Sequence, residues 1–306
     1  MKKLAVVLLG GLSRERKISF LTGRACSKAL RKKGYRVKEL DAKGNFVDTL
    51  KKIKPKFIFN ALHGQYGEDG FVQSILEALK IPYTHSGILA SNLAMDKVLS
   101  RILFKKNKIN TPKYFLLKKD HKLNIDKKLR SKKIKYPLVI KPKNEGSSLG
   151  VHICINKINF NKNYKKIRNK YDPIIVEEYI PGKEIQVAVM GKKALGAIEL
   201  VPKRRFYDYK AKYSSKAGTK HIMPAQLTKK KYNEVLFLAR KAHQILGCRG
   251  VTRSDFRFFN GKFYLLETNT QPGMTNLSLV PEIANYCGIS FEELVVWLAK
   301  DASNNR

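Results

Sequence analysis

The sequence predicts a mixed α/β protein with more than one domain, and three observations lead to this expectation. The chain has 306 residues, of which 43% are hydrophobic, a globular composition long enough for two or three modest domains. Its N-terminal part alternates apolar strands with amphipathic helices, which favours a parallel sheet. Its later part alternates short apolar strands with turns that contain glycine, which favours antiparallel hairpins.

The N-terminal part begins with an apolar run at residues 4–9, which predicts a buried strand ending at a Gly-Gly turn. We expect Ser13 to cap a helix that runs toward Lys33 and stops at Gly34. The segments "YRVKEL" and "PKFIFNAL" predict the next strands, "DGFVQSILEALKI" predicts an amphipathic helix, and "IPYTHSG" predicts a turn. In a parallel sheet of this kind, sites lie beyond the carboxyl ends of the strands.

The pattern changes near Ala94. The segment "MDKVLSRILFKKNKI" predicts a helix that ends before Pro112. Residues 136–155 predict a strand, a polar glycine loop and a second strand, which is a hairpin and not the strand–loop–helix of a Walker P-loop. Residues 173–190 predict two further strands around Pro181 and Gly182.

The C-terminal part predicts helices and one hairpin. Residues 203–221 are polar and lack any period, so we expect a long mobile loop. Residues 229–247 and 290–302 predict helices. Residues 250–269 predict a hairpin around Asn260 and Gly261.

The net charge of +38 predicts attraction to nucleic acid or to anionic membranes. The basic runs, however, are spread along the whole chain, and asparagine and isoleucine are interleaved with the lysines. This distribution favours a general bias in composition over a dedicated binding surface. We therefore expect non-specific adhesion to nucleic acid in dilute salt, and no specific nucleic-acid partner.

Membrane and secreted classes are disfavoured. No apolar run reaches the roughly 20 residues that span a bilayer, so we expect no membrane insertion. The start "MKKLAVVLLGGL" resembles a secretory signal, but charged residues follow it at once and no small-residue cleavage site is present. The four cysteines are scattered without CxxC spacing, which favours a reduced, cytoplasmic protein.

The segment "LLETNTQPGM" at residues 265–274 predicts a metal site. Glu267 and Asn269 lie two residues apart on a strand and therefore share one face. Asp255, on the facing strand, reaches that face only if the hairpin register is odd. We expect a three-residue loop at 259–261, with Gly261 in a left-handed conformation, to provide that register. Two carboxylates and an amide oxygen suit magnesium held together with phosphates.

A phosphate-binding site is predicted beside these acids. Lys141 ends a strand, and the following loop carries Gly146, Ser147, Ser148 and Gly150, whose N–H groups can point at phosphates. Together with Lys97 and the metal ligands, this pattern predicts an ATP site of a non-Walker type. The segment "EEYIPGKE" can then offer backbone contacts to a purine and a carboxylate to a ribose.

Six motifs occur in an order and spacing that resemble the D-alanine–D-alanine ligase family, nearly from end to end. They are "HGQYGEDG", "KPKNEGSSLG", "EEYIPG", "FYDYKAKY", "GVTRSDF" and "ETNTQPGMT". The resemblance implies an α/β ATP-grasp protein of three domains. These are an N-terminal parallel α/β domain at 1–96, a central α+β ATP-binding domain at 97–183, and a C-terminal α+β catalytic domain at 184–306.

The resemblance also implies a set of ATP and metal contacts. Those assigned to ATP are Lys97 and Lys141 at the phosphates, Ser147 and Ser148 in the glycine loop, and Glu177, Glu178, the Ile180 backbone and Glu184 around adenine and ribose. Those assigned to two magnesium ions, which manganese can replace, are Asp255, Glu267 and Asn269, with Glu267 bridging.

The amino-acid contacts that the resemblance implies lie elsewhere in the chain. Those expected at the first D-alanine are Glu15, which binds the ammonium group, and its neighbours His63 and Ser147. Those expected around the reacting carbonyl and the second D-alanine are Arg253 and the Gly273 N–H at the oxyanion, and Ser278 and the Leu279 backbone at the carboxylate. Lys212, an ATP contact, and Tyr213, a catalytic residue, belong to the loop that closes the site.

The activity that the resemblance implies is ATP-dependent ligation of two D-alanines through an acyl phosphate, for peptidoglycan synthesis. It also implies a homodimer through the N-terminal domain. The loop segment "YDYKAKY" looks like that of dipeptide-forming relatives and unlike that of relatives that make D-alanine–D-lactate. Two alternatives remain open: another ATP-dependent carboxylate–amine ligase on the same fold, and a basic nucleic-acid-binding protein.

Overall fold

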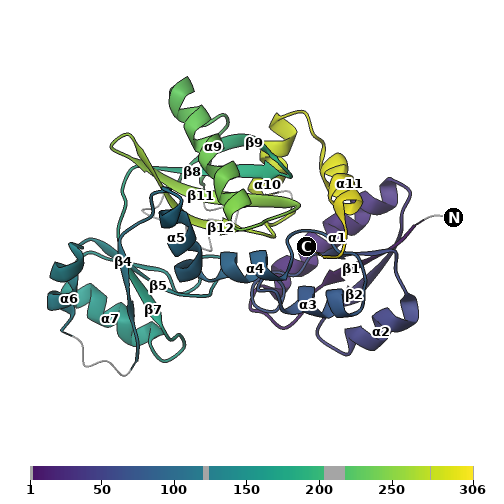
Figure 1. The fold of residues 1–306 in the computed structure, drawn as a ribbon, viewed down its shortest axis with the longest axis horizontal. Coiled ribbons are helices and arrows are strands. Elements are labelled where there is room, and N and C mark those ends of the chain that lie inside the picture. The colour runs from purple at the N-terminus through teal and green to yellow at the C-terminus, as the bar shows by residue number, and fades with distance from the viewer. Residues whose placement is uncertain (1–2, 120–123, 203–217, 276, 306) are drawn as a thin grey trace.

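The computed structural model describes residues 3–119, 124–202, 218–275 and 277–305, and these residues form three sheets in chain order (Figure 1). The first sheet is parallel, in the order β2-β1-β3, with β1 (Leu4–Leu9), β2 (Arg36–Asp41) and β3 (Phe57–Asn60). The second is antiparallel, in the order β4-β7-β5-β6, with β4 (Tyr114–Leu117), β5 (Leu138–Pro142), β6 (His152–Cys154) and β7 (Ile174–Glu178).

The third sheet is also antiparallel, in the order β10-β9-β8-β11-β12. Its strands are β8 (Lys183–Met190), β9 (Lys193–Val201), β10 (Lys220–Ile222), β11 (Val251–Phe259) and β12 (Lys262–Asn269). One parallel sheet and two antiparallel sheets confirm the expected ATP-grasp class. We propose that the three sheets mark the domains expected at 1–96, 97–183 and 184–306.

The helices cover the faces of these sheets. They are α1 (Arg16–Lys32), α2 (Phe46–Ile53), α3 (Phe71–Ala78), α4 (Ile88–Met95), α5 (Lys97–Lys106), α6 (Ile125–Lys132), α7 (Lys157–Ile167), α9 (Lys229–Ile245), α10 (Leu279–Tyr286) and α11 (Phe291–Asp301). None of the helices in the described ranges is long and apolar enough to cross a bilayer.

The parallel sheet is buried on both faces, as the continuous apolar run in β1 predicts. Ala5, Val7 and Leu9 face α1 and α11, whereas Val6 and Leu8 face α2 and α3. The first of these cores extends into β8, β9 and α10, so the N-terminal sheet and the third sheet share apolar packing. Figure 1 shows α11 lying beside α1, and the two helices are in contact.

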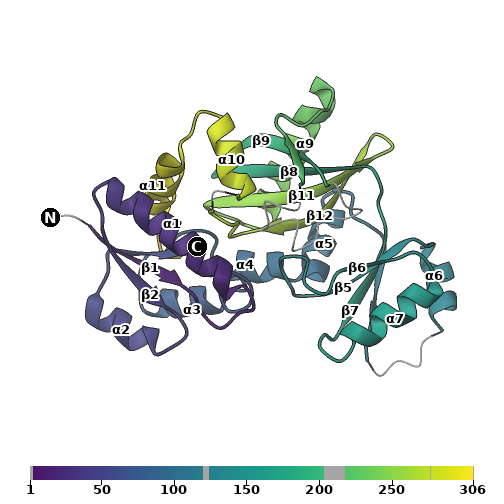
Figure 2. The ribbon, with the colours of Figure 1, turned by 180° about the vertical axis from the view of Figure 1, so that it is seen from behind.

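The other two sheets have separate cores. Helices α6 and α7 supply Leu129, Phe160 and Ile167 to the core of the second sheet, which lies at one end of the molecule in Figure 2. Helix α9 covers the third sheet, together with Ala90 and Ala94 of α4 and Phe104 of α5. Helix α5 therefore packs on the third sheet although it precedes the second sheet in the chain.

Asp255 faces Glu267 across the β11–β12 hairpin as expected, but the feature that sets this register is not the expected one. The turn at Asn260 and Gly261 has two residues, both in the left-handed region, and Phe259 pairs with Lys262. The expected three-residue loop at 259–261 was therefore wrong. A β-bulge between Asp255 and Phe256 supplies the odd residue instead, so Asp255 pairs with Glu267 and not with Leu266.

The first helix also begins differently from the expectation. Glu15, not Ser13, stands at the N-cap of α1, and no side chain caps it. The Ser13 hydroxyl donates to the His63 carbonyl at 2.5 Å and accepts from the Glu15 N–H at 3.1 Å. Ser13 thus joins this loop to the segment after β3, while the helix end at Gly34 (φ +86°) agrees with the expectation.

Several elements lie where sequence patterning predicted none. Helix α7 forms within a lysine- and asparagine-rich run, and its N-cap Asn156 accepts from the Asn159 N–H. Strand β10 occupies residues that were expected to belong to the long loop, and it pairs with β9. The rest of that loop at 203–217, which holds Lys212 and Tyr213, lies outside the described residues.

Substitution Gly23→Ala tests the packing of α1 on β1. A Cβ at Gly23 would approach the Leu9 Cβ to 2.7 Å, so the helix must move away from the strand. Glycine to alanine within a helix ordinarily stabilises by about 0.5–1 kcal/mol, but overpacking of this kind costs about 1–3 kcal/mol. We expect a net loss of about 1–2 kcal/mol in the free energy of unfolding, measured by urea denaturation.

The matched control is Gly44→Ala, because a Cβ at Gly44 meets nothing within 4 Å. Its free energy of unfolding should change by less than about 0.5 kcal/mol. A Gly23→Ala protein as stable as the unsubstituted chain would contradict the packing described here.

Candidate active site

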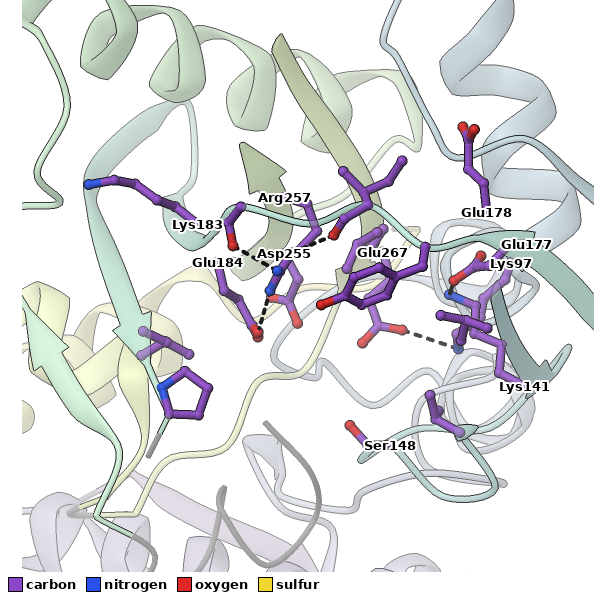
Figure 3. A pocket seen from close by; sticks show the side chains of 18 of the residues that line it. Lys97, Lys141, Ser148, Glu177, Glu178, Lys183, Glu184, Asp255, Arg257 and Glu267 are labelled. Atoms are coloured by element: carbon purple, nitrogen blue, oxygen red, sulfur yellow. Dashed lines mark hydrogen bonds and ion pairs between the residues drawn. The ribbon is translucent and has the colours of Figure 1, made fainter. Parts of the chain in front are cut away.

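A cavity of about 370 Å³ lies between the second and third sheets (Figure 3). Apolar side chains from both sheets line part of it, among them Val139, Ile180, Leu200 and Leu266. Charged side chains line the remainder, among them Lys97, Lys141, Glu177, Glu184, Asp255, Arg257 and Glu267. A slot that is apolar in one part and charged in another can hold a planar ring and a polyanion together.

The two acids at the centre of the site face each other across the β11–β12 hairpin. Asp255 and Glu267 are directly paired, and Arg253 pairs with Asn269 two residues further along. Arg253 donates to both Asp255 oxygens, from Nε at 2.7 Å and from Nη2 at 2.9 Å. Lys97 places its Nζ 3.2 Å from Glu267 Oε2. The convergence of Asp255, Glu267 and Asn269 on one face follows from this register.

These three side chains fit a hard divalent cation. They offer two carboxylates and an amide, which are the oxygen donors that magnesium takes alongside phosphate oxygens. The buried Nδ2 of Asn269 makes no hydrogen bond, so its amide can turn the oxygen toward a ligand without breaking a protein contact. Within the described ranges, no three His, Cys, Asp or Glu side chains gather as a metal cluster of protein ligands alone. Three protein donors leave the other positions around an octahedral magnesium ion to oxygens of phosphate or water.

Lys97 links these acids to the glycine loop. It is the first residue of α5, whose N-cap Asp96 accepts from the Val98 and Leu99 N–H groups. Its Nζ donates to the Glu145 carbonyl at 2.6 Å as well as contacting Glu267. The helix N-terminus thereby fixes the lysine between β12 and the loop that follows β5.

Lys141 belongs to a buried group of three charges. Its Nζ lies 2.8 Å from Glu177 Oε1, and Arg101 Nη2 lies 2.5 Å from Glu177 Oε2. Burial lowers the pKa of Lys141 to about 8, against the opposing effect of Glu177. Burial alone would raise the pKa of Glu177, but Arg101 and Lys141 outweigh it and hold that pKa below its usual value.

Arg101 was not predicted from the sequence, although its side chain is only 1% exposed. It lies four residues after Lys97 on α5 and therefore shares its face of the helix. A basic residue at that spacing in an apolar stretch is the signal that could have identified it. The Arg101 guanidinium also lies over the Tyr114 ring, 5.2 Å from its centroid.

The segment between the two sheets positions the residues expected around adenine and ribose. Glu178 accepts from the Lys113 N–H at 2.8 Å, and Figure 3 shows its carboxylate directed away from Lys141 and Glu267. Arg257 donates from Nη1 to Glu184 Oε2 at 3.2 Å and from Nε to the Ile180 carbonyl at 3.1 Å. Arg257 is a second arginine that the sequence did not identify.

A further cluster surrounds Glu15, which is 6% exposed. The Ser147 hydroxyl donates to Glu15 Oε2. A Cβ on Gly64 would approach Glu15 Oε1 to 3.0 Å, and a Cβ on Gly146 would approach it to 2.8 Å. Because glycine has no side chain, the backbone at both positions can approach this carboxylate closely. Ser147 itself has φ +48°, which agrees with a tightly turned glycine loop.

His63 lies beside this cluster and is held from both ring nitrogens. Its Nδ1 is 3.0 Å from Glu68 Oε1, and its Nε2 is 2.9 Å from Thr22 Oγ1. Burial by itself lowers the pKa of His63, but the hydrogen bond and charge of Glu68, together with the charge of Glu15, raise it above its usual value. Glu68 was not among the expected site residues, because alone it resembles a helix-starting acid.

The residues expected at the second amino acid lie after β12. Ser278 is the N-cap of α10, and its Oγ accepts from the Thr275 N–H at 2.9 Å. A Cβ on Gly273 would approach this Oγ to 2.9 Å, so Gly273 and Ser278 lie close together. Leu279 opens α10, where N–H groups lack partners within the helix and can meet an anion.

Substitution Glu177→Gln tests the buried charge group. It keeps the shape of the side chain but leaves Arg101 and Lys141 without a carboxylate in a buried position. Breaking a buried pair in this way costs about 3–5 kcal/mol, and we expect a loss of that size in the free energy of unfolding by urea denaturation.

Glu178→Gln is the control one residue away. Its amide oxygen can still accept from the Lys113 N–H, so its stability should change by less than about 1 kcal/mol. Equal losses in the two variants would show that the three buried charges have no special role in stability.

Comparisons with known proteins agree with this geometry. The family model for the D-ala D-ala ligase N-terminus matches residues 38–86, and that for the D-ala D-ala ligase C-terminus matches residues 103–300. The D-alanine–D-alanine ligase of Pelagibacter ubique is 57% identical over 100% of both chains. That of Parvibaculum lavamentivorans is 44% identical over 99% of both chains.

Solved structures give the same result. The D-alanine–D-alanine ligase of Bacillus anthracis superimposes with a TM-score of 0.87 at 33% identity, covering 98% of this chain and 97% of that one. A structure of the Bacillus anthracis enzyme complexed with ATP superimposes with a TM-score of 0.85 at 29% identity, with the same coverage. Full-length identity and fold together favour a ligase over a nucleic-acid-binding protein, and the chain belongs to the D-alanine–D-alanine ligase family.

Proposed function

We propose that this chain joins two D-alanine molecules into D-alanyl-D-alanine, converting ATP to ADP and phosphate, for peptidoglycan synthesis in the cytoplasm. The observation that carries the proposal is one unbroken line of contacts. Glu267 contacts Lys97, Lys97 contacts the Glu145 carbonyl, and the next residue, Gly146, packs on Glu15. The metal-and-phosphate end and the amino-acid end are therefore parts of one site.

The chemistry requires such an arrangement because an amino-acid carboxylate is a poor electrophile. Transfer of the γ-phosphoryl group from ATP to a D-alanine carboxylate oxygen gives an acyl phosphate and releases ADP. The amine of a second D-alanine then attacks the carbonyl carbon, the new C–N bond forms, and phosphate leaves. Positioning and charge neutralisation supply most of the catalysis in phosphoryl transfer.

ATP is proposed to lie in the cavity between the two sheets. Its base would meet the apolar side chains and the backbone near Ile180, with Glu184 at the ribose. Its phosphates would meet Lys97, Lys141 and the loop that carries Ser147 and Ser148. The support for this placement is the cavity lining together with the ATP complex of the Bacillus anthracis enzyme.

Asp255, Glu267 and Asn269 would hold the magnesium ions that accompany ATP, and manganese could replace them. When bound, these ions neutralise the charge of the phosphoryl group. Arg253 already lies against Asp255, and from there its guanidinium can stabilise the oxyanion with the Gly273 N–H.

D-alanine recognition is proposed for two polar clusters. Glu15, supported by Ser147 and His63, would bind the ammonium group of the first D-alanine. Ser278 and the Leu279 N–H would bind the carboxylate of the second. Lys212 and Tyr213 are assigned to the closing loop on the family resemblance alone.

A homodimer is proposed on an apolar surface formed by Tyr66, Phe71, Ile88 and Leu89. Phe71 is 53% exposed and Leu89 is 68% exposed, and with Ile88 they line one hollow. The Tyr66 and Phe71 rings pack edge to face at 5.3 Å. Contiguous exposed apolar side chains of this kind mark contact surfaces, and apolar contacts would offset repulsion between two strongly basic chains.

The ligase proposal is tested by magnesium-dependent phosphate release from ATP at moderate salt. We expect release with D-alanine and not with L-alanine, and a product with the mass of the dipeptide. Glu267→Gln should lower the rate by about 100-fold or more, since it removes a carboxylate that would hold the magnesium ions beside the phosphates. Glu234→Gln should stay within about threefold, because Glu234 pairs with Lys231 on α9 and does not line the cavity. Phosphate release with another amino acid, and not with D-alanine, would overturn the proposed substrate but leave the fold assignment unchanged.

The dimer proposal predicts that Leu89→Glu shifts the solution mass from dimer toward monomer in light scattering. Ile158→Glu is the matched control, because Ile158 is 77% exposed on α7 in the second sheet's domain. A monomer before substitution, or a dimer that Leu89→Glu leaves intact, would exclude this surface as the interface.

A further inference from the structure

Arg257 is a charged residue of the cavity to which the proposed function gives no role. It lies on β11 with its side chain 16% exposed, and its guanidinium makes three contacts (Figure 3). Nε donates to the Ile180 carbonyl at 3.1 Å, Nη2 to the Gly182 carbonyl at 2.7 Å, and Nη1 to Glu184 Oε2 at 3.2 Å. A planar fork with this many donors can fix several acceptors at once, which lysine cannot.

The two carbonyl acceptors belong to the segment at 179–182, which crosses from β7 of the second sheet to β8 of the third. Pro181 has no N–H, so the peptide that joins it to Ile180 can form hydrogen bonds only through its carbonyl. Arg257 donates to the Ile180 carbonyl and also to the Gly182 carbonyl two residues later. This crossover segment therefore depends on a side chain of β11 for its conformation.

The same segment is pressed closely against β11. Gly182 has φ +90°, and a Cβ there would lie 2.2 Å from the Phe258 carbonyl oxygen. Only glycine allows this approach without moving the backbone. Arg257 is adjacent to Phe258 in β11, and its guanidinium reaches the carbonyls on both sides of Pro181.

Glu184 is held by the same guanidinium. It is the residue directly paired with Arg257 across β8 and β11, and it lines the cavity. Its other oxygen, Oε1, accepts from Gln186 Nε2 at a long 3.4 Å. The hydrogen bond from Arg257 thus helps to hold this carboxylate where it lines the cavity.

We propose that Arg257 is a positioning residue for nucleotide selection: by fixing the crossover segment and the Glu184 carboxylate, it sets the affinity for the nucleoside of ATP and the preference for an intact ribose. This inference rests on the proposed function, since it places the base at the crossover segment and the ribose at Glu184. Arg257 itself acts through these groups and needs no contact with ATP.

Loss of Arg257 should affect nucleoside binding more than the chemical step. The phosphates, the acids at 255 and 267 and the amino-acid clusters use other residues, so loss of Arg257 should weaken nucleoside binding and leave the chemical step. We expect Arg257→Met to raise KM for ATP about 10- to 30-fold while kcat changes less than about threefold, as for lost ground-state binding.

The decisive readout is the ratio of kcat/KM for ATP to that for 2′-deoxy-ATP and 3′-deoxy-ATP. The unsubstituted enzyme should favour ATP over at least one analogue by about 10-fold or more, because a hydroxyl bound to a carboxylate is a strong contact. Arg257→Met should reduce that preference to about threefold or less. A residue with only a structural role would lower activity on all three nucleotides alike and keep the ratio.

Arg257→Lys distinguishes the proposed positioning role from attraction of ATP by positive charge alone. It keeps the positive charge but lacks the fork, so we expect a raised KM and a reduced ribose preference close to those of Arg257→Met. If charge alone attracts ATP, Arg257→Lys will behave as the unsubstituted enzyme, and the proposal is overturned. Arg249→Met is the control, because Arg249 is exposed and contacts Ser303 far from the cavity.

Failure of this inference can be told apart from failure of the proposed function. Titration calorimetry with a non-hydrolysable ATP analogue and with its 2′- and 3′-deoxy forms needs no amino acid. If the unsubstituted chain consumes no ATP with D-alanine, the ligase proposal fails, and the nucleotide affinities still test Arg257. Equal affinities and equal ribose preference in the unsubstituted and Arg257→Met proteins would overturn the positioning role.

Discussion

Pairing of opposite charges around the cavity is the constraint on which the site depends. Four of the acidic side chains that line this cavity are each met by a base. The pairs are Asp255 with Arg253, Glu267 with Lys97, Glu177 with Lys141 and Arg101, and Glu184 with Arg257. Buried charges are tolerable only when they are paired in this way, so the second sheet, α5 and the third sheet must meet in one arrangement.

The same pairs explain how the site can work as a ligase. The phosphates of ATP would compete for the lysines, and the metal ions would compete for Asp255 and Glu267. Each partner therefore exchanges one strong charge interaction for another, and little new ordering is needed when the nucleotide binds. Because Lys97 also contacts the Glu145 carbonyl, and Gly146 lies close to Glu15, the phosphate end and the amino-acid end are connected through two adjacent residues.

The sequence predicted much of this site because its motifs are local. The Asn260-Gly261 turn, the face shared by Glu267 and Asn269, and the glycine loop after Lys141 follow from spacing within a few residues. The bulge at Asp255 could not be predicted, because it arises where β11 pairs on both sides with β8 and β12. Arg101 and Arg257 were missed for a similar reason: their partners, Glu177 and the carbonyls at 180 and 182, come from distant segments.

The measurement that tests the exchange of charge partners most directly is proton uptake on nucleotide binding. Burial lowers the pKa of Lys141 to about 8, so near pH 8 about half of this lysine is neutral. Phosphates at its side favour the charged form, and binding of magnesium with a non-hydrolysable ATP analogue should therefore take up a fraction of a proton near pH 8. Calorimetry in buffers of different ionisation enthalpy measures that uptake. We expect uptake that disappears in Lys141→Arg. Absence of uptake in the unsubstituted protein would exclude the exchange of charge partners at this lysine.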